Sequence, residues 1–495
     1  MAITAPTKTA TAVDPVFGST SVVSDGSANT PQQPHNQADL IIVGAGIAGC
    51  AAAVAFGRQG RSVIVLERSL KEPERVVGEL LQPGGVKALE ALGLTDCLEG
   101  IDAVPCYGYR VSYHKEAVNI PYPKAVEAPY GSPEGRAFRH GRFIQKLREA
   151  VKRTPNVKVI ESKVTEIVED KAMGKVVGVT AETGPEMTKE YYFGKLTLVA
   201  DGYASTFRKS YLPNKPASRS KFWALELLEA ELPTPYFGHV ILSNAPPILL
   251  YQISPRQTRI FMDIPTGLPS AKPSAGGIKA HMLNVVLPEL PEGCQNSFKQ
   301  AVAGGKFRSM PNSFLPPSTQ KTPGLVMIGD ALNMRHPLTG GGMTVAFNDV
   351  VLLSRLLAPE IVPSLDDSAA VLKQMARFHW TRKQGSSIIN ILAMALYSLF
   401  AADDAALDTL RNGCFRYFQR GGKCIDEPCG MLAGLIRAPW VLVYHFFSVA
   451  FYAMWLRVTE VPIWQKPYEL VVASPWVLWT ACWVIGPYLL WECRA

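Results

Sequence analysis

The sequence lacks the patterns that define metal-binding, disulfide-stapled and nucleic-acid-binding proteins. Its nine cysteines form no CxxC pair, and the nearest two, Cys424 and Cys429, have no histidine beside them. A zinc site is therefore not expected, and the thiols are expected to be reduced, as in the cytosol. The net charge is +8, but the lysines and arginines are scattered rather than gathered in a stripe. This excess suits an anionic membrane surface or an ordinary solvated surface, and not a nucleic acid.

The first residues of the sequence lack any long apolar run. Residues 1–37 are rich in Ala, Thr, Ser, Pro and Gln. Because such a composition cannot bury enough apolar surface to fold, it predicts a disordered N-terminal segment. It also has no hydrophobic stretch of the kind that a signal peptide needs, so no signal peptide is expected.

Long apolar runs occur instead near the end of the sequence. Residues 438–456 and 470–491 are uncharged, and each approaches the roughly 20 residues that a helix needs to cross a bilayer. Their tryptophans fit the aromatic belts of membrane–water interfaces: Trp440, Trp455, Trp476, Trp479, Trp483 and Trp491. We predict membrane association, with a buried helical hairpin as the alternative. Pro475, Pro487 and His445 leave in-plane insertion open beside a full span.

A compact strand–turn–helix–strand unit begins near residue 39. Residues 40–43 form an apolar run, residues 47–56 are rich in alanine, and residues 61–67 read R-S-V-I-V-L-E. These three segments predict a strand, a helix and a second strand. A unit of this kind closes with a right-handed crossover, which places both strands in one parallel sheet.

The turn of this unit carries the glycine spacing of a dinucleotide-binding loop. Gly44 permits the sharp bend, Gly46 lets a pyrophosphate approach the backbone, and Gly49 lets the helix pack closely on the strand. Glu67 ends the second strand, at the offset where a carboxylate accepts a hydrogen bond from the adenosine ribose. An acidic residue here fits FAD or NAD(H) better than NADPH.

Two further glycine clusters favour FAD. Gly202 follows an apolar run, and Asp330 follows the predicted strand 324–328. Asp330 could accept hydrogen bonds from the hydroxyls of a ribityl chain. The run Thr-Gly-Gly-Gly at 339–342 precedes the predicted helix 343–357, whose free N–H groups could meet a pyrophosphate or the anionic edge of a flavin.

The order of the segments predicts an α/β protein. It has an FAD-binding Rossmann-like domain, an inserted β-rich substrate domain and a C-terminal helical membrane-associated region. The β-rich part is indicated by strand-like runs at 238–242, 248–253 and 259–264, and the pattern is helical after about residue 366. The predicted boundaries are 1–37 for the disordered segment, 38–214 with 321–365 for a discontinuous FAD-binding domain, 215–320 for the substrate domain with contributions from 105–130, and 366–495 for the helical region.

Two long motifs resemble one family of flavoproteins. Residues 67–85 read E-R-S-L-K-E-P-E-R-V-V-G-E-L-L-Q-P-G-G, and residues 329–346 read G-D-A-L-N-M-R-H-P-L-T-G-G-G-M-T-V-A. Both are similar to motifs of the squalene monooxygenase (squalene epoxidase) family, within the FAD-dependent aromatic-hydroxylase-like superfamily. The resemblance extends from about Asp39 to the C-terminus and includes both apolar runs.

The resemblance implies roles for particular residues. With the glycines Gly44, Gly46, Gly49, Gly341 and Gly342, the residues that match FAD-contacting positions are Ile47, Ala48, Glu67, Arg68, Arg75, Arg148, Val164, Asp330 and Met343. Arg75 and Arg148 are physically suited to the charge of a pyrophosphate. Tyr109 matches a tyrosine beside the flavin ring, and it is our candidate catalytic residue together with Gln82. The residues that match the substrate pocket are Leu242, Tyr251, Pro337 and Leu338.

The resemblance also implies an activity and its partners. The activity is epoxidation of squalene to 2,3-oxidosqualene, or of a related triterpene to its own epoxide, by molecular oxygen and reduced FAD. No side chain can supply an electrophilic oxygen atom, so the cofactor must do so. No second GxGxxG unit and no iron–sulfur cysteine pattern occur, which leaves direct reduction by NADPH open. The resemblance implies an NADPH–cytochrome reductase instead, and the endoplasmic reticulum or microsomal membrane with the catalytic domain facing the cytosol.

The chain departs from the family in two places, and other functions stay open. Some members carry an N-terminal membrane segment that has no counterpart here, so attachment is expected to rest on the C-terminal helices. Leu80 stands where an aromatic residue can occur. An isoprenoid double-bond reductase, another terpenoid epoxidase and a prenyl-binding chaperone that has lost the flavin are the alternatives. A flavin halogenase is disfavoured, because the sequence has no WxWxIP motif.

Overall fold

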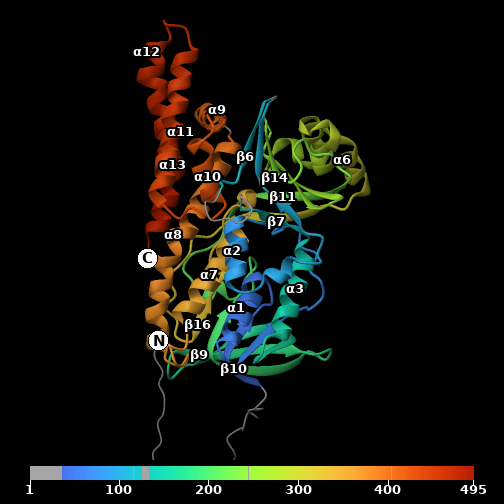
Figure 1. Ribbon diagram of the computed structural model, residues 1–495, viewed down its shortest axis with the longest axis vertical. Helices are drawn as coiled ribbons and strands as arrows, with labels where there is room; N and C mark the ends of the chain where they lie inside the picture. The colour runs from blue at the N-terminus through green and yellow to red at the C-terminus, as the bar shows by residue number, and fades with distance from the viewer. Residues whose placement is uncertain (1–35, 115, 125–132, 244, 403, 495) are drawn as a thin grey trace, which may run out of the picture. The chain divides into compact units, whose positions relative to one another are not determined.

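A computed structural model describes residues 36–114, 116–124, 133–243, 245–402 and 404–494 (Figure 1). The predicted disordered segment 1–37 lies outside the described residues, apart from Asn36 and Gln37. Within the described residues the chain is a mixed α/β protein with two large sheets and a C-terminal group of helices. The predicted fold class is confirmed, whereas the exact domain boundaries stay a prediction.

The first sheet is built around the predicted parallel unit. Leu40 lies opposite Val63 on one side and Leu196 on the other, so the first strand is central. Leu40, Ile41 and Ile42 have no exposed surface, as expected for a parallel strand that is covered on both faces. The strands of this sheet are β1 (Gln37–Val43), β2 (Val63–Glu67), β8 (Val157–Asp170), β9 (Lys175–Thr183), β10 (Thr188–Val199) and β16 (Leu325–Met327).

Two long strands of this sheet change partners along their length. The first residues of β8 run parallel to β2, and the rest run antiparallel to β9. β10 likewise starts antiparallel to β9 and continues parallel to β1 and β16. The strands β8, β9 and β10 therefore form an antiparallel meander within this sheet. Three helices pack beside one another on this part of the molecule, namely α1 (Ile47–Arg58), α3 (His140–Arg153) and α7 (Gly342–Leu356).

The second sheet has seven strands in the order β15-β11-β14-β13-β12-β5-β6. Its two faces pack against different partners: Ile241 belongs to the core beside α6 (Glu292–Gly304), and Leu242 belongs to the core beside the C-terminal helices. The strands are β5 (Gly108–Tyr113), β6 (Glu116–Pro121), β11 (Ala217–Leu228), β12 (Gly238–Leu242), β13 (Ile248–Ser254), β14 (Gln257–Pro265) and β15 (Arg308–Phe314). Strands from the segment 105–130 thus extend the sheet that is made mainly by 215–320.

A third, small sheet and one helix connect these two parts. The sheet consists of β3 (Leu80–Leu81), β7 (Gly135–Ala137) and β4 (Val104–Cys106). The helix α2 (Pro83–Ala91) follows β3 directly, and it packs against α7. The sequence motif at residues 67–85 therefore ends at the junction of the two large sheets.

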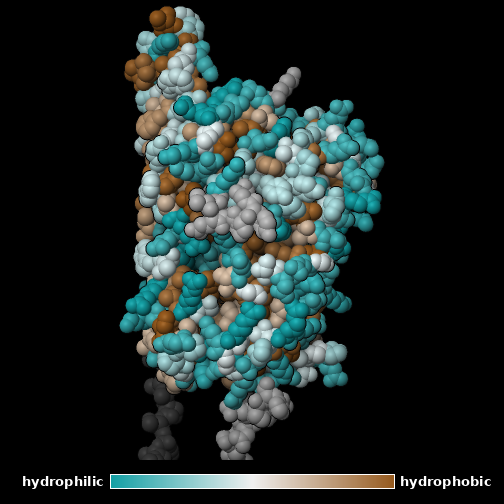
Figure 2. Space-filling model, in the orientation of Figure 1, coloured by the Kyte–Doolittle hydropathy of each residue, from teal (hydrophilic) through white to brown (hydrophobic). Residues whose placement is uncertain are grey.

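The C-terminal part is helical, as predicted. Two of its helices are long and apolar enough to cross a membrane, α11 (Pro439–Glu460) and the continuous segment Lys466–Cys493. They lie side by side in Figure 1, and hydrophobic residues gather at the end of this hairpin near α12 in Figure 2. The segment Lys466–Cys493 consists of α12 (Lys466–Tyr468), the π-helical turn η9 (Glu469–Ala473) and α13 (Ser474–Cys493). The other helices of the C-terminal part are α8 (Ser368–Phe400), α9 (Ala405–Gln419) and α10 (Lys423–Leu432).

The hairpin leaves large apolar side chains uncovered. Trp440 is 73% exposed and Trp483 is 70% exposed, and Ile463 and Trp464 project where the two helices are connected. Apolar surface of this extent is rare on soluble monomers and marks a site of protein or membrane interaction. Together with the length and hydropathy of the two helices, it supports association with a membrane.

The hairpin is held to the rest of the molecule by a close helix contact. A Cβ atom on Gly413 of α9 would lie 2.3 Å from Cβ of Ala453 on α11. We expect Gly413→Ala to separate the two helices and to destabilise the protein by about 1–3 kcal/mol, although alanine favours helices more than glycine does. The melting temperature of the protein in detergent measures this.

The matched control for this prediction is Gly486→Ala on α13. A Cβ atom on Gly486 would meet nothing within 4 Å. The same substitution in a helix interior should therefore leave the melting temperature unchanged or raise it. Equal effects of the two substitutions would show that the close contact between α9 and α11 does not hold the hairpin.

Candidate functional site

A large cavity lies between the glycine turns of the first sheet and the second sheet. It contains about 1470 Å³ of space free of protein atoms, part of which is open to solvent. One side is formed by Gly46 of the first predicted glycine segment, Gly202 of the second, and Gly329 and Gly342 of the third. The cavity therefore brings together segments that are almost 300 residues apart in the sequence.

The first turn is shaped for a ligand that approaches the backbone. Gly44 has a φ of +101°, and a Cβ atom there would lie 2.7 Å from the carbonyl oxygen of Ala200. A Cβ atom on Gly49 would lie 1.9 Å from the carbonyl oxygen of Gly44. At Gly46, in contrast, a Cβ atom would meet nothing within 4 Å, and this residue lines the cavity. Since α1 begins at Ile47, the turn leaves room for a phosphate at a helix N-terminus, which fits a dinucleotide.

Glu67 and Arg148 stabilise this turn from the side that faces away from the cavity. Glu67 accepts a hydrogen bond from the N–H of Ala45 at 2.7 Å, and Arg148 lies 3.7 Å from the same carboxylate. The Arg148 side chain also donates from Nε to the carbonyl oxygen of Ala45 at 3.1 Å. Neither side chain is among the residues that line the cavity. Their contacts in the structure therefore fix the conformation of the loop.

Arg75 and Asp330 do line the cavity, and they meet across it. Their side chains form an ion pair at 3.4 Å, and each is 32% exposed. The guanidinium of Arg75 also lies 5.6 Å from the ring centre of Tyr203. The pair is open enough to be rearranged by an incoming ligand, so both residues could turn toward phosphates and hydroxyl groups.

Gln82 and Tyr109 form the centre of a buried hydrogen-bond network. Gln82 donates from Nε2 to the hydroxyl of Tyr109 at 2.6 Å and to the carbonyl oxygen of Thr339 at 2.8 Å. The Tyr109 hydroxyl donates to the same carbonyl oxygen at 3.1 Å, and Tyr122 donates to Gln82 Oε1 at 2.5 Å. Tyr109 lines the cavity, whereas Gln82 has no exposed surface and lies behind it. Burial raises the pKa of Tyr109 well above its ordinary value, so the phenol stays neutral.

The opposite wall of the cavity is apolar. Tyr251, Pro337 and Leu338, three of the four substrate candidates, belong to it. Leu242 does not line the cavity and packs in the core beside the C-terminal helices. Further apolar lining residues from the second sheet are Phe222, Val240, Leu249, Leu250, Phe261, Met310 and Pro311. A wall of this composition suits a hydrocarbon ligand.

The remaining cofactor candidates divide into two groups. Ile47, Ala48 and Met343 line the cavity. Gly341 packs away from it, because a Cβ atom there would lie 2.4 Å from Cγ2 of Ile389 on α8. Arg68 is exposed and Val164 is half-buried on β8, and both lie outside the cavity lining. The roles of all these residues toward FAD stay predictions.

Sequence reasoning missed several charged residues at this site. Buried Arg208 donates to the carbonyl oxygens of Ala331 and Tyr203, at 3.0 and 2.8 Å, and so connects the second glycine cluster to the third. Glu79 lines the cavity and forms a two-point ion pair with Arg259 at 2.7 and 2.9 Å. Burial raises the pKa of Glu79 to about 6. Glu79 lies inside the first long motif and could have been noticed, whereas no local pattern marks Arg208 or Arg259.

The two histidines on the cavity wall are neutral near pH 7. Burial lowers the pKa of His140 to about 3, and it lowers the pKa of His239 to about 4. His140 Nδ1 lies 2.8 Å from the carbonyl oxygen of Gly78, so the neutral ring donates from this nitrogen. The cavity thus combines a glycine-rich polar side with an apolar side and no charged histidine.

The architecture is that of FAD-dependent flavoproteins. A flavoprotein/dehydrogenase from Cytophaga hutchinsonii superposes with a TM-score of 0.67 over 86% of this chain and 100% of its own, at 18% identity. PqsL of Pseudomonas aeruginosa, described as a probable FAD-dependent monooxygenase, gives a TM-score of 0.61 over 74% of this chain and 97% of its own, at 21% identity. At these identities the likeness establishes the fold.

The chain belongs to the squalene epoxidase family. The family described as Squalene epoxidase matches residues 193–471, and the family described as Glucose inhibited division protein A matches residues 39–211. A squalene epoxidase of Aspergillus fumigatus is 57% identical over 97% of this chain and 99% of its own length. A squalene monooxygenase of Mus musculus is 43% identical over 92% of this chain and 78% of its own. The family that the two long motifs indicate is confirmed.

The buried neutral state of His140 predicts a loss of stability in acid. Its pKa is about 3 when folded and about 6.5 when unfolded, so the unfolded chain binds the proton more readily between these values. The stabilisation is complete above pH 6.5 and decreases as the pH falls, by about 2 kcal/mol between pH 7 and pH 5. His140→Asn keeps a hydrogen-bond donor for the carbonyl oxygen of Gly78. We expect its melting temperature to fall less between pH 7 and pH 5 than that of the unaltered protein.

The control for this prediction is His114→Asn. His114 is exposed and has a φ of 52°, which asparagine tolerates. This variant should show the same acid sensitivity as the unaltered protein. If His140→Asn also keeps the full sensitivity, another group causes the loss of stability.

Proposed function

We propose that the chain is an FAD-dependent monooxygenase that epoxidises squalene to (S)-2,3-oxidosqualene in sterol or triterpenoid biosynthesis. One observation carries the proposal: a single cavity joins glycine turns that suit FAD to an apolar wall that suits squalene. The relatives of 57% and 43% identity, which are named squalene epoxidase and squalene monooxygenase, match nearly the whole chain.

FAD would lie along the glycine-rich side of the cavity. The free N–H groups at the start of α1 would face the pyrophosphate, and Arg75 would balance its charge. Asp330 would accept hydrogen bonds from the ribityl hydroxyls, and Gly342 and Met343 at the start of α7 would face the ring. When bound, FAD supplies the reduced ring that activates molecular oxygen.

The protein's own side chains would position the reactants and exclude water. Tyr109 forms a neutral wall beside the ring, and Gln82 holds its hydroxyl and the peptide of Thr339 in one arrangement. Tyr251 and Leu338 would hold the alkene on the opposite side. Excluding water in this way would protect the reactive oxygen from wasteful decay. No side chain needs to act as an acid or a base toward the double bond.

Electrons would come from NADPH through a membrane-bound cytochrome reductase. Squalene dissolves in the bilayer, and the apolar helices α11 and α13 suit attachment to it. We propose that these helices hold the enzyme on the endoplasmic reticulum or microsomal membrane, with the cavity on the cytosolic side. Substrate and reductase would then reach the enzyme from the same membrane.

A reconstituted turnover assay tests the proposed reaction. Purified protein in detergent would receive FAD, NADPH, a microsomal reductase and squalene, and oxidosqualene would be followed by mass spectrometry. We expect a yellow protein and a product that disappears when the reductase is omitted.

Each part of the proposal fails in its own way in this assay. A yellow, reducible protein that yields only hydrogen peroxide would contradict squalene as the substrate, and it would favour another isoprenoid. Full turnover without the reductase would contradict the proposed partner. A colourless protein that binds prenyl chains but no flavin would support the non-enzymatic alternative.

Substitution of Gln82 tests the proposed positioning of Tyr109. Gln82→Leu keeps the size of the side chain but removes the three hydrogen bonds of Gln82, to Tyr109, Thr339 and Tyr122, and leaves the phenol only its bond to the carbonyl oxygen of Thr339. We expect kcat to fall by about 10- to 100-fold, the order of loss that small errors in positioning cause, with the KM for squalene little changed. In the control, Gln59→Leu, a hydrogen bond to the carbonyl oxygen of Ser354 on α7 is lost, and kcat should be unchanged. Unaltered kcat in Gln82→Leu would remove Gln82 from the site.

A further inference from the structure

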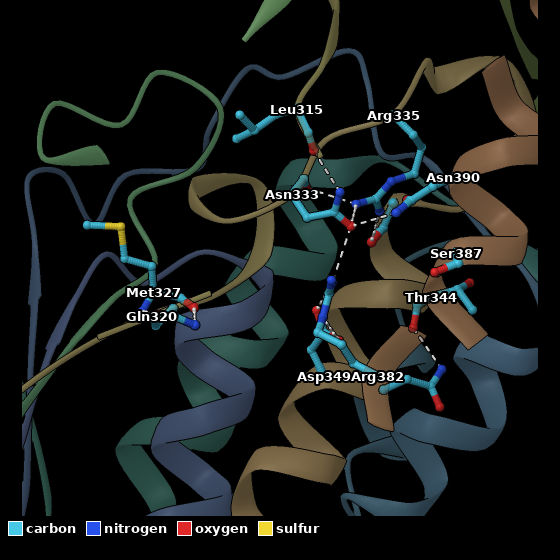
Figure 3. A network of polar contacts seen from close by, with 12 residues as sticks. Leu315, Gln320, Met327, Asn333, Arg335, Thr344, Asp349, Arg382, Ser387 and Asn390 are labelled. Atoms are coloured by element: carbon cyan, nitrogen blue, oxygen red, sulfur yellow. Dashed lines mark hydrogen bonds and ion pairs between the residues drawn. The ribbon is translucent and has the colours of Figure 1, made fainter. Parts of the chain in front are cut away.

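Asn333 lies at the centre of a buried polar network beside the cavity (Figure 3). Its side-chain oxygen accepts hydrogen bonds from Arg335 at 2.8 Å, from Arg382 at 3.1 Å and from Asn390 at 3.2 Å. Its side-chain nitrogen donates to the carbonyl oxygen of Leu315 at 2.8 Å. Asn333 belongs to residues 329–342, which we call the cofactor loop, whereas Arg382 and Asn390 belong to α8. The loop is therefore held from outside by one helix.

The network determines where one charge of the cavity lies. Arg335 lines the cavity and is 8% exposed. It donates to both the side-chain and the main-chain oxygen of Asn333, each at 2.8 Å. Among the described residues, no carboxylate lies within ion-pair distance of Arg335. The guanidinium also donates to the carbonyl oxygen of Gly342 at 3.4 Å. Its two shorter hydrogen bonds, which place it at the cavity, both go to Asn333.

The same network reaches the last turn of α13. One carboxylate oxygen of Glu492 accepts a hydrogen bond from Asn390 at 2.7 Å, and the other accepts one from Ser387 at 2.7 Å. The ammonium group of Lys383 donates to the carbonyl oxygens of Glu492 and Arg494, at 2.7 and 2.6 Å. Glu492 is 6% exposed. The end of the apolar hairpin is thus fastened to α8 by a buried carboxylate.

Glu492 sets the orientation of the Asn390 amide. The amide nitrogen has two hydrogens, and it uses one for Glu492 and the other for Asn333. A carboxylate can only accept hydrogen bonds. If the amide were flipped, its oxygen would face the carboxylate and the oxygen of Asn333, which is unfavourable at both places. The carboxylate therefore selects the orientation in which Asn390 holds Asn333.

We propose that Glu492 is a positioning residue for the cofactor loop. Its carboxylate orients Asn390, Asn390 holds Asn333, and Asn333 places Arg335 at the cavity. The hairpin that attaches the protein to the membrane thereby contributes to the cofactor site at its other end. This inference rests on FAD as the ligand of the cavity.

The variant Glu492→Gln tests the inference. A glutamine amide can donate to the side-chain oxygen of Asn390, so the Asn390 amide is free to flip and to release Asn333. We expect the dissociation constant for FAD to rise about tenfold, as for the loss of a buried hydrogen bond, in a fluorescence titration of the apoprotein in detergent. The visible absorption bands of the bound flavin should shift. Glu492→Asp, which again can only accept, should restore part of the affinity.

The matched control is Glu469→Gln at the opposite end of the hairpin. Glu469 is 7% exposed and pairs with Arg457, and its contacts lie on the hairpin and not on the cofactor loop. This variant removes a buried carboxylate of the same helical segment, so it should leave FAD affinity and the flavin spectrum unchanged. The melting temperature of each apoprotein reports any general loss of folding.

Several outcomes would overturn the inference. One is FAD binding by Glu492→Gln that equals that of the unaltered protein, and another is an equal loss in Glu469→Gln. A third is a loss in Glu492→Gln that Glu492→Asp does not reduce although both apoproteins melt normally. If the unaltered protein binds no FAD, the proposed function falls as well. If it binds FAD and forms oxidosqualene, a negative result with Glu492→Gln removes only the inference.

Discussion

The site depends on the close approach of three backbone turns at one edge of the first sheet. A Cβ atom on Gly44 would lie 2.7 Å from the carbonyl oxygen of Ala200, and one on Gly329 would lie 3.1 Å from the Cβ atom of Ala48. The first and third turns therefore fit against their neighbours because Gly44 and Gly329 lack side chains. The strands β1, β10 and β16 run parallel, so their carboxyl ends meet at this edge. The glycine-rich side of the cavity is placed by this close packing of the turns.

The second constraint is the division of the cavity into a polar and an apolar side. The polar side comes from loops after parallel strands, where free N–H groups and a few charged residues are available. The apolar side comes from the second sheet, whose faces are covered by two separate cores. Tyr109 belongs to that sheet, yet Gln82 from the first part of the chain holds its hydroxyl. This hydrogen bond joins the two sides, so the distance between cofactor and substrate would be set by buried and rigid groups.

Features with a local cause could be predicted from the sequence, and features with a tertiary cause could not. The glycine spacing and the apolar runs constrain the chain within about twenty residues, so the parallel unit and the apolar helices were both found. Leu242 matches a substrate position of the family, but it lies two residues beyond Val240 on the same face of β12, where it packs in the core beside the C-terminal helices and does not line the cavity. Gly341 is predicted to bind the cofactor together with Gly342, and in the structure it packs against Ile389 on α8. Arg208 and Arg259 bind Ala331 and Glu79, which are more than 100 residues away in the sequence, so no local sequence pattern predicts these contacts.

The buried charges around the cofactor loop explain why the C-terminal helices cannot be regarded as an anchor alone. Arg382 is neutralised by Asp349 through two hydrogen bonds, at 2.9 and 2.7 Å, but Arg335 and Lys383 have no such partner. Buried cations are tolerated only where oxygen atoms surround them. For Arg335 these oxygens come from Asn333 in the cofactor loop, and for Lys383 they come from the end of α13. Withdrawing α13 would leave Lys383 without its acceptors and Asn390 without its orienting carboxylate. The packing of the hairpin against α8 therefore helps to hold the cofactor loop in a single conformation.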